Sequence, residues 1–195
     1  MPRIPLTDHL RRAPFTVRQG VDAGLGVKRL RGRDLQRPFR GVRSPEPGKL
    51  TLKDLCSAYQ KSMPSHAYFC GVTAAVLMCI PLPQQHEESR VLHVAVPPSF
   101  RAPTGKGIRG HTFASHHDQV RSWHGIRASS AEFTWCQLGA VLTLPDLIAA
   151  GDYLIHHRRP LTTAERLEEA VVSYAGRRGK PALRAALPLL NDRSE

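Results

Sequence analysis

The spacing of apolar residues in the first 43 positions predicts two short helices followed by a strand. Val17 and Val21 are spaced as one face of a helix, and we expect both to face the core. Thr16 is placed to cap this helix at its start. Gly24 can adopt the left-handed conformation that ends it.

A second helix is predicted after Gly26, and it is dense in cationic side chains. Val27 and Leu30 are expected to face the core. The side chains that would then project outward are Lys28, Arg29 and Arg31. Residues 37–43, RPFRGVR, alternate basic and apolar residues as an edge strand would. Helix, turn, helix and wing strand are the parts of a winged helix-turn-helix, whose second helix enters the DNA major groove.

Proline, serine and glycine make residues 44–48 a linker by composition. We therefore divide the chain into a winged helix-turn-helix head, residues 1–45, and a helix-rich domain, residues 46–195. The elements predicted in the second domain are helices at 51–61 and 71–79, strands at 92–96 and 108–111, a hairpin at 120–128, and helices opening near 129, 145, 162 and 181. The predicted fold class is α+β, with a small and mostly antiparallel sheet.

Positive charge is concentrated at the N-terminal end of the chain. The net charge is +12, and residues 1–43 hold 11 Lys or Arg against 3 Asp, a net +8. Such asymmetry indicates a polyanionic partner, in this context DNA before RNA or a membrane. A solvated basic surface is the alternative, and charge alone does not separate the two.

The sequence contains neither a signal peptide nor an apolar run long enough for a membrane span. Its cysteines lack the CxxC spacing of metal sites; they are Cys56, Cys70, Cys79 and Cys136. We expect them to be free thiols in the core of a cytoplasmic protein with no membrane partner.

No arrangement of residues predicts catalysis or a cofactor. The histidine pairs at 116–117 and 156–157 have no further ligands at zinc spacing. His93 and His111 are expected to be packed residues of strands rather than a proton relay. The segment GVRSPEPGK lacks the spacing of a phosphate-binding loop. We therefore expect a protein that is not an enzyme and that binds no metal.

The candidate DNA-binding residues fall into groups with different expected contacts. Lys28, Arg29 and Arg31 would contact bases or phosphates. Arg37, Arg40 and Arg43 would follow the backbone or enter a minor groove. Arg33 belongs to either group or pairs with Asp34, and Arg18 is either solvated or bound to phosphate. Residues 176–180, GRRGK, are a second phosphate contact or an ordinary loop.

Several segments spread along the chain carry a family resemblance: MPRIPL, PFTV, RLRGRDLQRPFRGVR, LHVAVPP, GIRGH, LIAAGDYLI and PLTTAE. With these the chain resembles actinobacterial AbiEi-type antitoxins, a region that in many relatives precedes a nuclease domain similar to very-short-patch-repair endonucleases. The resemblance implies a winged helix-turn-helix followed by an α+β antitoxin domain. It also implies binding to double-stranded DNA, and often autoregulation of an operon that encodes a nucleotidyltransferase-type toxin nearby.

Three hypotheses follow. The favoured one is a sequence-specific transcriptional regulator of antitoxin kind, bound to an inverted repeat as a homodimer or to tandem sites. The alternative is the DNA-targeting portion of an endonuclease system whose catalytic domain is absent from this chain. The third is an interaction scaffold whose basic head is neutralised by an acidic protein.

Overall fold

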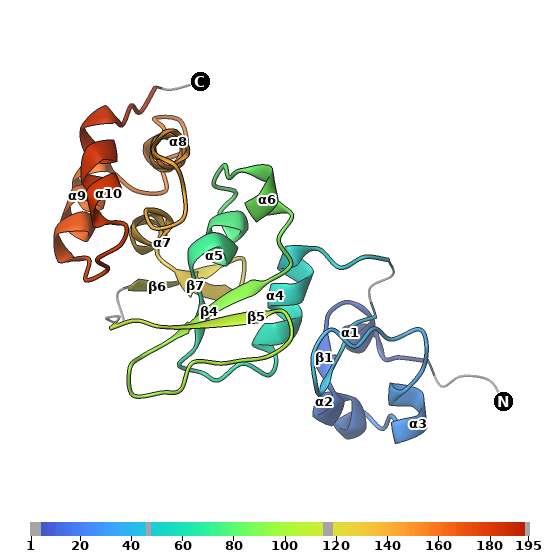
Figure 1. The fold of residues 1–195 in the computed structure, drawn as a ribbon. Helices are drawn as coiled ribbons and strands as arrows, with labels where there is room; N and C mark the ends of the chain where they lie inside the picture. The colour runs from blue at the N-terminus through green and yellow to red at the C-terminus, as the bar shows by residue number, and fades with distance from the viewer. Residues whose placement is uncertain (1–4, 46–47, 115–118, 194–195) are drawn as a thin grey trace. The chain divides into compact units, whose positions relative to one another are not determined.

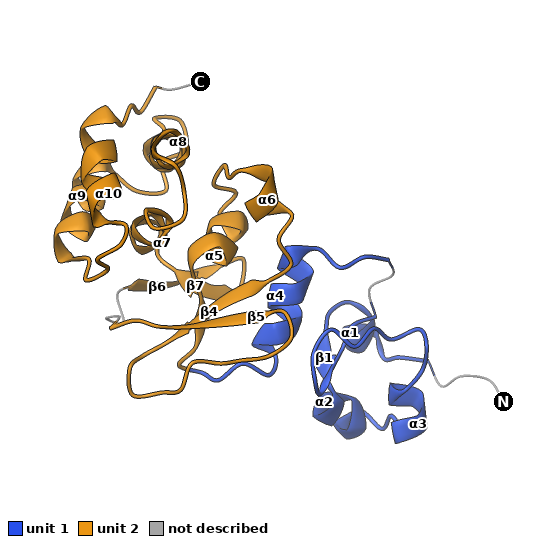
Figure 2. Ribbon diagram, in the orientation of Figure 1, with its two compact units in different colours: residues 1–65 blue, residues 66–195 orange. Residues whose placement is uncertain are grey.

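The computed structural model describes residues 5–45, 48–114 and 119–193. The chain divides into two compact units, Met1–Ser65 and His66–Glu195 (Figure 2). Helix α4, Leu52–Gln60, which we predicted in the second domain, belongs to the first unit. The predicted histidine pair at 116–117 lies outside the described residues.

Unit 1 begins with three short helices and two short strands. These elements are α1 (Asp8–Arg11), β1 (Phe15–Thr16), α2 (Val17–Asp22), α3 (Val27–Leu30) and β2 (Val42–Arg43) (Figure 1). Strands β1 and β2 pair antiparallel, and an isolated antiparallel bridge joins Gln36 to Ser44, the residue after β2. The wing is therefore a turn at residues 37–41 and not the longer strand that we predicted.

The ends of α2 are set by local hydrogen bonds, as predicted. The Thr16 hydroxyl accepts from the Gln19 amide at 3.1 Å, and the Gln19 side chain accepts from the Thr16 amide at 2.9 Å. This reciprocal pair is a capping box. Gly24, with φ of 81°, ends the helix in the left-handed region.

One hydrophobic cluster of unit 1 consists of Phe15 and of leucines from α1, α3 and the segments outside helices and strands: Leu6, Leu10, Phe15, Leu25, Leu30 and Leu35. The prediction that Val21 and Val27 face this core is wrong, because their side chains are 50% and 59% exposed. Helix α2 turns Gly20 toward the core instead, and α3 is so short that it buries only Leu30. A Cβ on Gly20 would lie 2.6 Å from Leu30, so the missing side chain lets the two helices approach.

Helix α4 completes unit 1. The helix begins after Thr51, as predicted, and Thr51 forms a capping box with Asp54. Its buried side includes Leu55 and Cys56. The ring of Tyr59 meets that of Phe39 edge to face, with centroids 5.0 Å apart. This contact joins α4 to the turn of the wing.

Unit 2 is built on a five-stranded sheet in the order β5-β4-β3-β7-β6. The strands are β3 (Tyr68–Phe69), β4 (Leu92–Val96), β5 (Ile108–Thr112), β6 (Val120–Trp123) and β7 (Ile126–Ser129). The α+β class is confirmed, but the sheet is mixed rather than mostly antiparallel. Strands β4 and β5 run parallel, as do β3 and β7, whereas β3–β4 and β6–β7 are antiparallel.

The hairpin predicted at residues 120–128 is confirmed as β6 and β7. His124 and Gly125 form its two-residue turn with φ of 49° and 79°. Two consecutive positive φ values are those of a type I′ turn, whose twist matches that of the flanking strands. The sequence alone therefore fixed the place of this turn.

The helices of unit 2 pack around α7 (Ala131–Leu138), which is buried along nearly its whole length. The others are α5 (Gly71–Leu77), α6 (Gln84–Glu87), α8 (Leu144–Ile155), α9 (Ala164–Ser173) and α10 (Lys180–Ala186). α7 contacts α5 and also α8 and α9, and these last two lie with α10 on the side of α7 away from the sheet (Figure 1). The Trp135 indole donates to the Leu147 carbonyl at 2.9 Å, which fixes α7 against α8.

Two predicted helix starts shift by one residue. The caps are Ser130 and Thr163, not the residues before them. The preceding residues are buried and bond elsewhere: Ser129 shares a 2.7 Å hydrogen bond with Thr134, and Thr162 donates to Glu132 at 2.5 Å. The Ser129 hydroxyl is thus bound within the first turns of α7 and the Thr162 hydroxyl by a residue 30 positions away, so neither caps its helix.

The cysteines are free, but only Cys56, Cys70 and Cys136 are buried. Cys79 is exposed and has φ of 59°, so the prediction of a core thiol is wrong for this residue. It follows the end of α5, where the chain leaves the helix in a left-handed conformation.

Candidate nucleic-acid interface

Helix α3 presents two of the predicted DNA-binding cations to solvent. Lys28 lies within the helix and Arg31 is its C-terminal cap, and both are exposed. Leu30 anchors the helix, since its side chain is only 1% exposed. The single turn of α3 thus has one buried side and one cationic side.

Arg29 has a different position from its two neighbours. Its guanidinium donates to both carboxylate oxygens of Asp34, at 3.1 and 2.8 Å, and its side chain is only 10% exposed. The ion pair crosses close to Gly32, where an added Cβ would lie 2.5 Å from the Asp34 carboxylate. Arg29 therefore fastens the segment after α3, a role that we had weighed for Arg33. The acidic residue five positions on is the signal that identifies the pair.

Arg37 and Arg43 bond to the carbonyl end of α3. Arg37 donates to the Arg31 carbonyl at 2.7 Å, and Arg43 donates to the carbonyls of Leu30 and Val42 at 2.6 and 2.9 Å. Cations at this end of a helix satisfy carbonyl groups that have no partner within the helix. The sequence carried no local signal for these bonds, because they join the wing to the helix.

These bonds bring cationic side chains close together. Burial lowers the pKa of Arg43 from its ordinary value, and the charges of Arg37 and Arg31 lower it further. Like charges repel, so this arrangement favours an anion that would lie beside all three. Arginine remains protonated at neutral pH despite such a shift.

The remaining predicted residues are exposed on other parts of the same small fold. Arg18 is on α2, Arg33 follows α3, and Arg40 is in the turn of the wing. Together with α3 they place cations on both helices and on the wing. Phosphate contacts that position a helix-turn-helix on DNA come from such flanking residues.

The charge of the chain follows the division into units. Unit 1 contains 14 Lys or Arg and 5 Asp or Glu, a net +9, whereas unit 2 contains 14 and 11, a net +3. Cations are equally numerous in the two units, so the difference comes from the scarcity of acidic residues in unit 1. A polyanion would therefore be attracted mainly to unit 1.

Residues 176–180 are the second segment that we predicted to contact phosphate, and one of its cations is hydrogen-bonded within the protein. The Lys180 ammonium donates to the carbonyls of Val172 and Tyr174, at 3.3 and 2.9 Å, near the end of α9. Arg177 and Arg178 are exposed in the loop before α10. Lys180 thus joins two helices, and the segment has the features of the ordinary loop that was our alternative.

His93 and His111 lie together on neighbouring strands of unit 2. Their rings stack, and Nδ1 of His93 is 3.1 Å from Nε2 of His111. Burial lowers the pKa of His93 to about 4, and the charges of His111, Arg109 and His86 act in the same direction. His93 is therefore neutral at pH 7, as expected for a packed residue.

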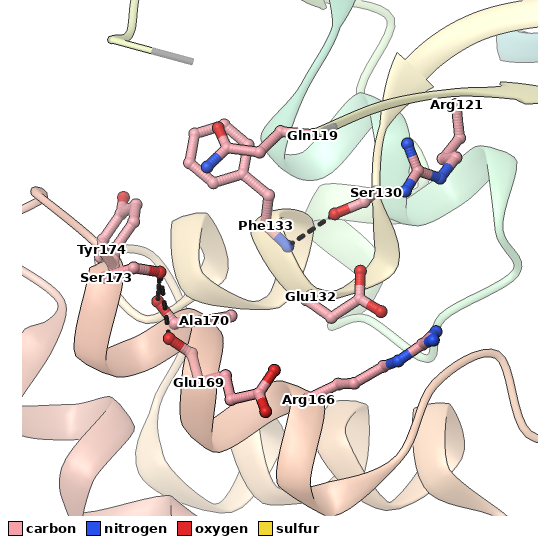
Figure 3. A pocket seen from close by; sticks show the side chains of 10 residues that line it. All are labelled: Gln119, Arg121, Ser130, Glu132, Phe133, Arg166, Glu169, Ala170, Ser173 and Tyr174. Carbon is pink, nitrogen blue, oxygen red and sulfur yellow. Dashed lines mark hydrogen bonds between the residues drawn. The ribbon is translucent and has the colours of Figure 1, made fainter. Parts of the chain in front are cut away.

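A cavity of about 310 Å³ lies in unit 2 between β6, α7 and α9 (Figure 3). Its charged lining consists of Arg121 and Arg166 with Glu132 and Glu169, and Arg166 extends toward Glu132 in the view of Figure 3. Two cations and two carboxylates leave the lining without net charge. This cavity therefore has no cationic character of its own.

The described parts of the chain contain no cluster of three or more His, Cys, Asp or Glu that could hold a metal ion. Within the same residues, none of the helices combines the length and the apolar composition needed to cross a membrane.

Residues 8–44 thus have the element order of a winged helix-turn-helix within an α+β chain. The sequence matches neither a protein-family model nor a curated protein. Among solved structures, the fold is similar to that of the RV2827C protein from Mycobacterium tuberculosis, with a TM-score of 0.55. The similarity covers 93% of this chain and 78% of that one at 15% sequence identity, and it concerns the fold alone.

Proposed function

We propose that the protein is a sequence-specific DNA-binding transcriptional regulator of antitoxin type, which binds double-stranded DNA through unit 1. The observation that carries this proposal is helix α3, which is anchored by Leu30 and exposes Lys28 and Arg31 on its other side. In a helix-turn-helix this second helix lies in the major groove. Arginine can bond two acceptors of guanine there, and lysine contributes a point charge.

The flanking cations support the same orientation on DNA. Arg18, Arg33 and Arg40 are exposed around α3 and would contact phosphates on either side of the groove. Arg37 and Arg43 hold the wing against the end of α3 and have donors left over, because a guanidinium has five N–H groups. Arg29 has no direct part in this proposal, since its guanidinium is bound to Asp34.

The antitoxin part of the proposal is supported by the resemblance of many segments to AbiEi-type antitoxins. In that arrangement the protein binds the promoter of its own operon. The partner that this part requires is a nucleotidyltransferase-type toxin encoded nearby. Binding as a homodimer would place two copies of α3 on an inverted repeat, about one helical turn of DNA apart.

The proposal is tested by titrating labelled duplexes with the full-length protein and following fluorescence anisotropy. One duplex carries the DNA upstream of the gene, and the other has the same composition in shuffled order. We expect the upstream duplex to bind at least tenfold more tightly at 150 mM salt. The double variant Lys28→Ala, Arg31→Ala should lose at least tenfold of that affinity.

Equal affinity for the two duplexes would overturn sequence-specific binding. A double variant that binds like the wild type, while keeping the same thermal unfolding temperature, would overturn the role of α3. Both residues are exposed, so the variant is expected to fold normally.

A further inference from the structure

Helix α3 exposes an apolar side chain among its cations. Val27 is the first residue of the helix, and its side chain is 59% exposed. The core of unit 1 includes Leu30 but not Val27. The fold of unit 1 therefore does not explain why an apolar residue occupies this position.

The exposure of Val27 shows that its side chain faces solvent, although it lies only three residues before the buried Leu30. Successive residues of an α-helix are rotated by about 100°, so residues 27 and 31 are adjacent on its surface. Lys28 borders Arg31 on the same solvent-facing side, whereas the ion-paired Arg29 and the buried Leu30 occupy the rest of the helix surface, with Leu30 about 60° from Val27. Val27 thus shares one surface with Lys28 and Arg31.

If α3 lies in the major groove, this surface meets base edges. The N-terminal residues of the second helix are those that contact bases in helix-turn-helix proteins. Valine cannot bond the donors and acceptors of the groove, and the apolar group that the groove offers is the C5-methyl of thymine. We propose that Val27 contacts a thymine methyl and thereby selects T·A at one position of each site. The inference rests on the proposed function and deepens it.

The neighbouring residues agree with this assignment. Arg31 lies one turn from Val27 on the same surface and can reach guanine acceptors, so the two side chains would select adjacent or nearby base pairs. Gly26, just before Val27, has open space around its Cα, which leaves room for the DNA backbone to approach. The two cations beside Val27, Lys28 and Arg31, favour a polyanion over an apolar protein surface as the occupant.

The test uses duplexes of the upstream DNA in which one thymine at a time is replaced by deoxyuridine, which lacks only the methyl group. Each duplex is titrated with the wild type and with Val27→Ala. For the wild type, we expect one position in each site to lose about threefold to fivefold of the affinity, as burial of one methyl group implies. For Val27→Ala, the same replacement should have no effect.

The matched control is Val21→Ala, which removes an equally exposed valine from α2. This variant should keep the wild-type response to deoxyuridine at every position. Unchanged thermal unfolding of both variants shows that they are folded.

The outcomes separate the inference from the proposed function. Preference for the upstream duplex with a flat deoxyuridine series overturns the role of Val27 and leaves the proposed function standing. A deoxyuridine effect that persists in Val27→Ala assigns the methyl contact to another residue and overturns the inference in the same way. Equal binding of upstream and shuffled DNA overturns both.

Discussion

At the residue scale, the arginines of unit 1 differ in role although the sequence presents them alike. Arg29 is bound to Asp34, whereas Lys28 and Arg31 on either side of it are exposed. Arg43 is half-buried and bonds to main-chain carbonyls. A surface cation can bind a phosphate without leaving a partner, but a cation already paired must first break its bond. The number of arginines in a segment therefore overstates the number available to DNA.

Gly20 decides how closely α2 and α3 approach, so Gly20→Ala should destabilise unit 1. The new methyl would meet side-chain atoms of Leu30 at 2.6 Å and Phe15 at 3.2 Å, and both residues are buried. Overpacking of this kind costs about 1–3 kcal/mol. Urea denaturation followed by circular dichroism measures the change in the free energy of unfolding.

Gly26→Ser is the matched control for this prediction. Gly26 caps α3 with extended backbone and open space around it, so serine fits without strain. Serine is the better cap by about 0.3 kcal/mol, and this variant should unfold at the same or slightly higher urea concentration. Loss of stability in Gly26→Ser equal to that in Gly20→Ala would contradict the packing argument.

At the element scale, caps and turns could be predicted because they depend on residues within about four positions. Thr16 as the cap of α2, the left-handed Gly24 and the hairpin that turns at Gly125 were predicted from the sequence, whereas the reciprocal bond of Gln19 was not. The parallel pairing of β4 and β5 was not, since a strand pattern does not give the direction of its neighbour. The wing was predicted too long, because alternation of side chains does not require a paired strand.

The pairing of β4 and β5 brings His93 and His111 together, and this predicts a stability that depends on pH. The pKa of His93 is lowered to about 4, so the unfolded chain binds a proton more readily than the folded one. Stability is therefore complete above the ordinary histidine pKa near 6.5 and falls as the pH drops toward 4. Between pH 7 and pH 5 we expect a loss of about 1 kcal/mol, reduced from the full linkage value by the partial exposure of the ring.

The measurement is the free energy of unfolding of wild type and His93→Gln in urea at pH 7 and pH 5. The variant lacks the titrating ring, so it should lose less stability between these pH values than the wild type. Histidines distant from this pair contribute equally to both proteins, so the difference between the two reports His93 together with its interaction with His111. Equal losses would show that His93 is not responsible.

At the scale of the whole molecule, equal numbers of cations in the two units give unequal net charge. Unit 1 carries +9 and unit 2 carries +3, each with 14 Lys or Arg. If DNA binds unit 1, affinity should depend on salt through the cations of that unit. About six phosphate contacts predict a slope near −5 for the logarithm of affinity against the logarithm of salt concentration.

Two matched double variants test which unit contains the cations that cause the salt dependence of affinity. The double variant Lys28→Ala, Arg31→Ala should make the slope less steep by about one to two, because up to two phosphate contacts are lost. Arg158→Ala, Arg159→Ala removes the same charge from an exposed segment of unit 2 and should leave slope and affinity nearly unchanged. If the unit 2 variant had the larger effect on slope and affinity, the DNA-binding surface would lie on unit 2 and not on unit 1.

The sequence by itself determined the short helices of unit 1, their caps, the hairpin of unit 2 and the concentration of positive charge. All of these depend on residues near one another in the chain or on composition. Only the tertiary structure decided which cations remain exposed, where Val27 points and which strands run parallel. The bond from Arg43 to Leu30 spans 13 positions, and the bond from the Gly71 amide to Gln137 spans 66. Contacts at such separations are fixed by the packing of the whole fold, because no local pattern specifies which distant partner a side chain will meet.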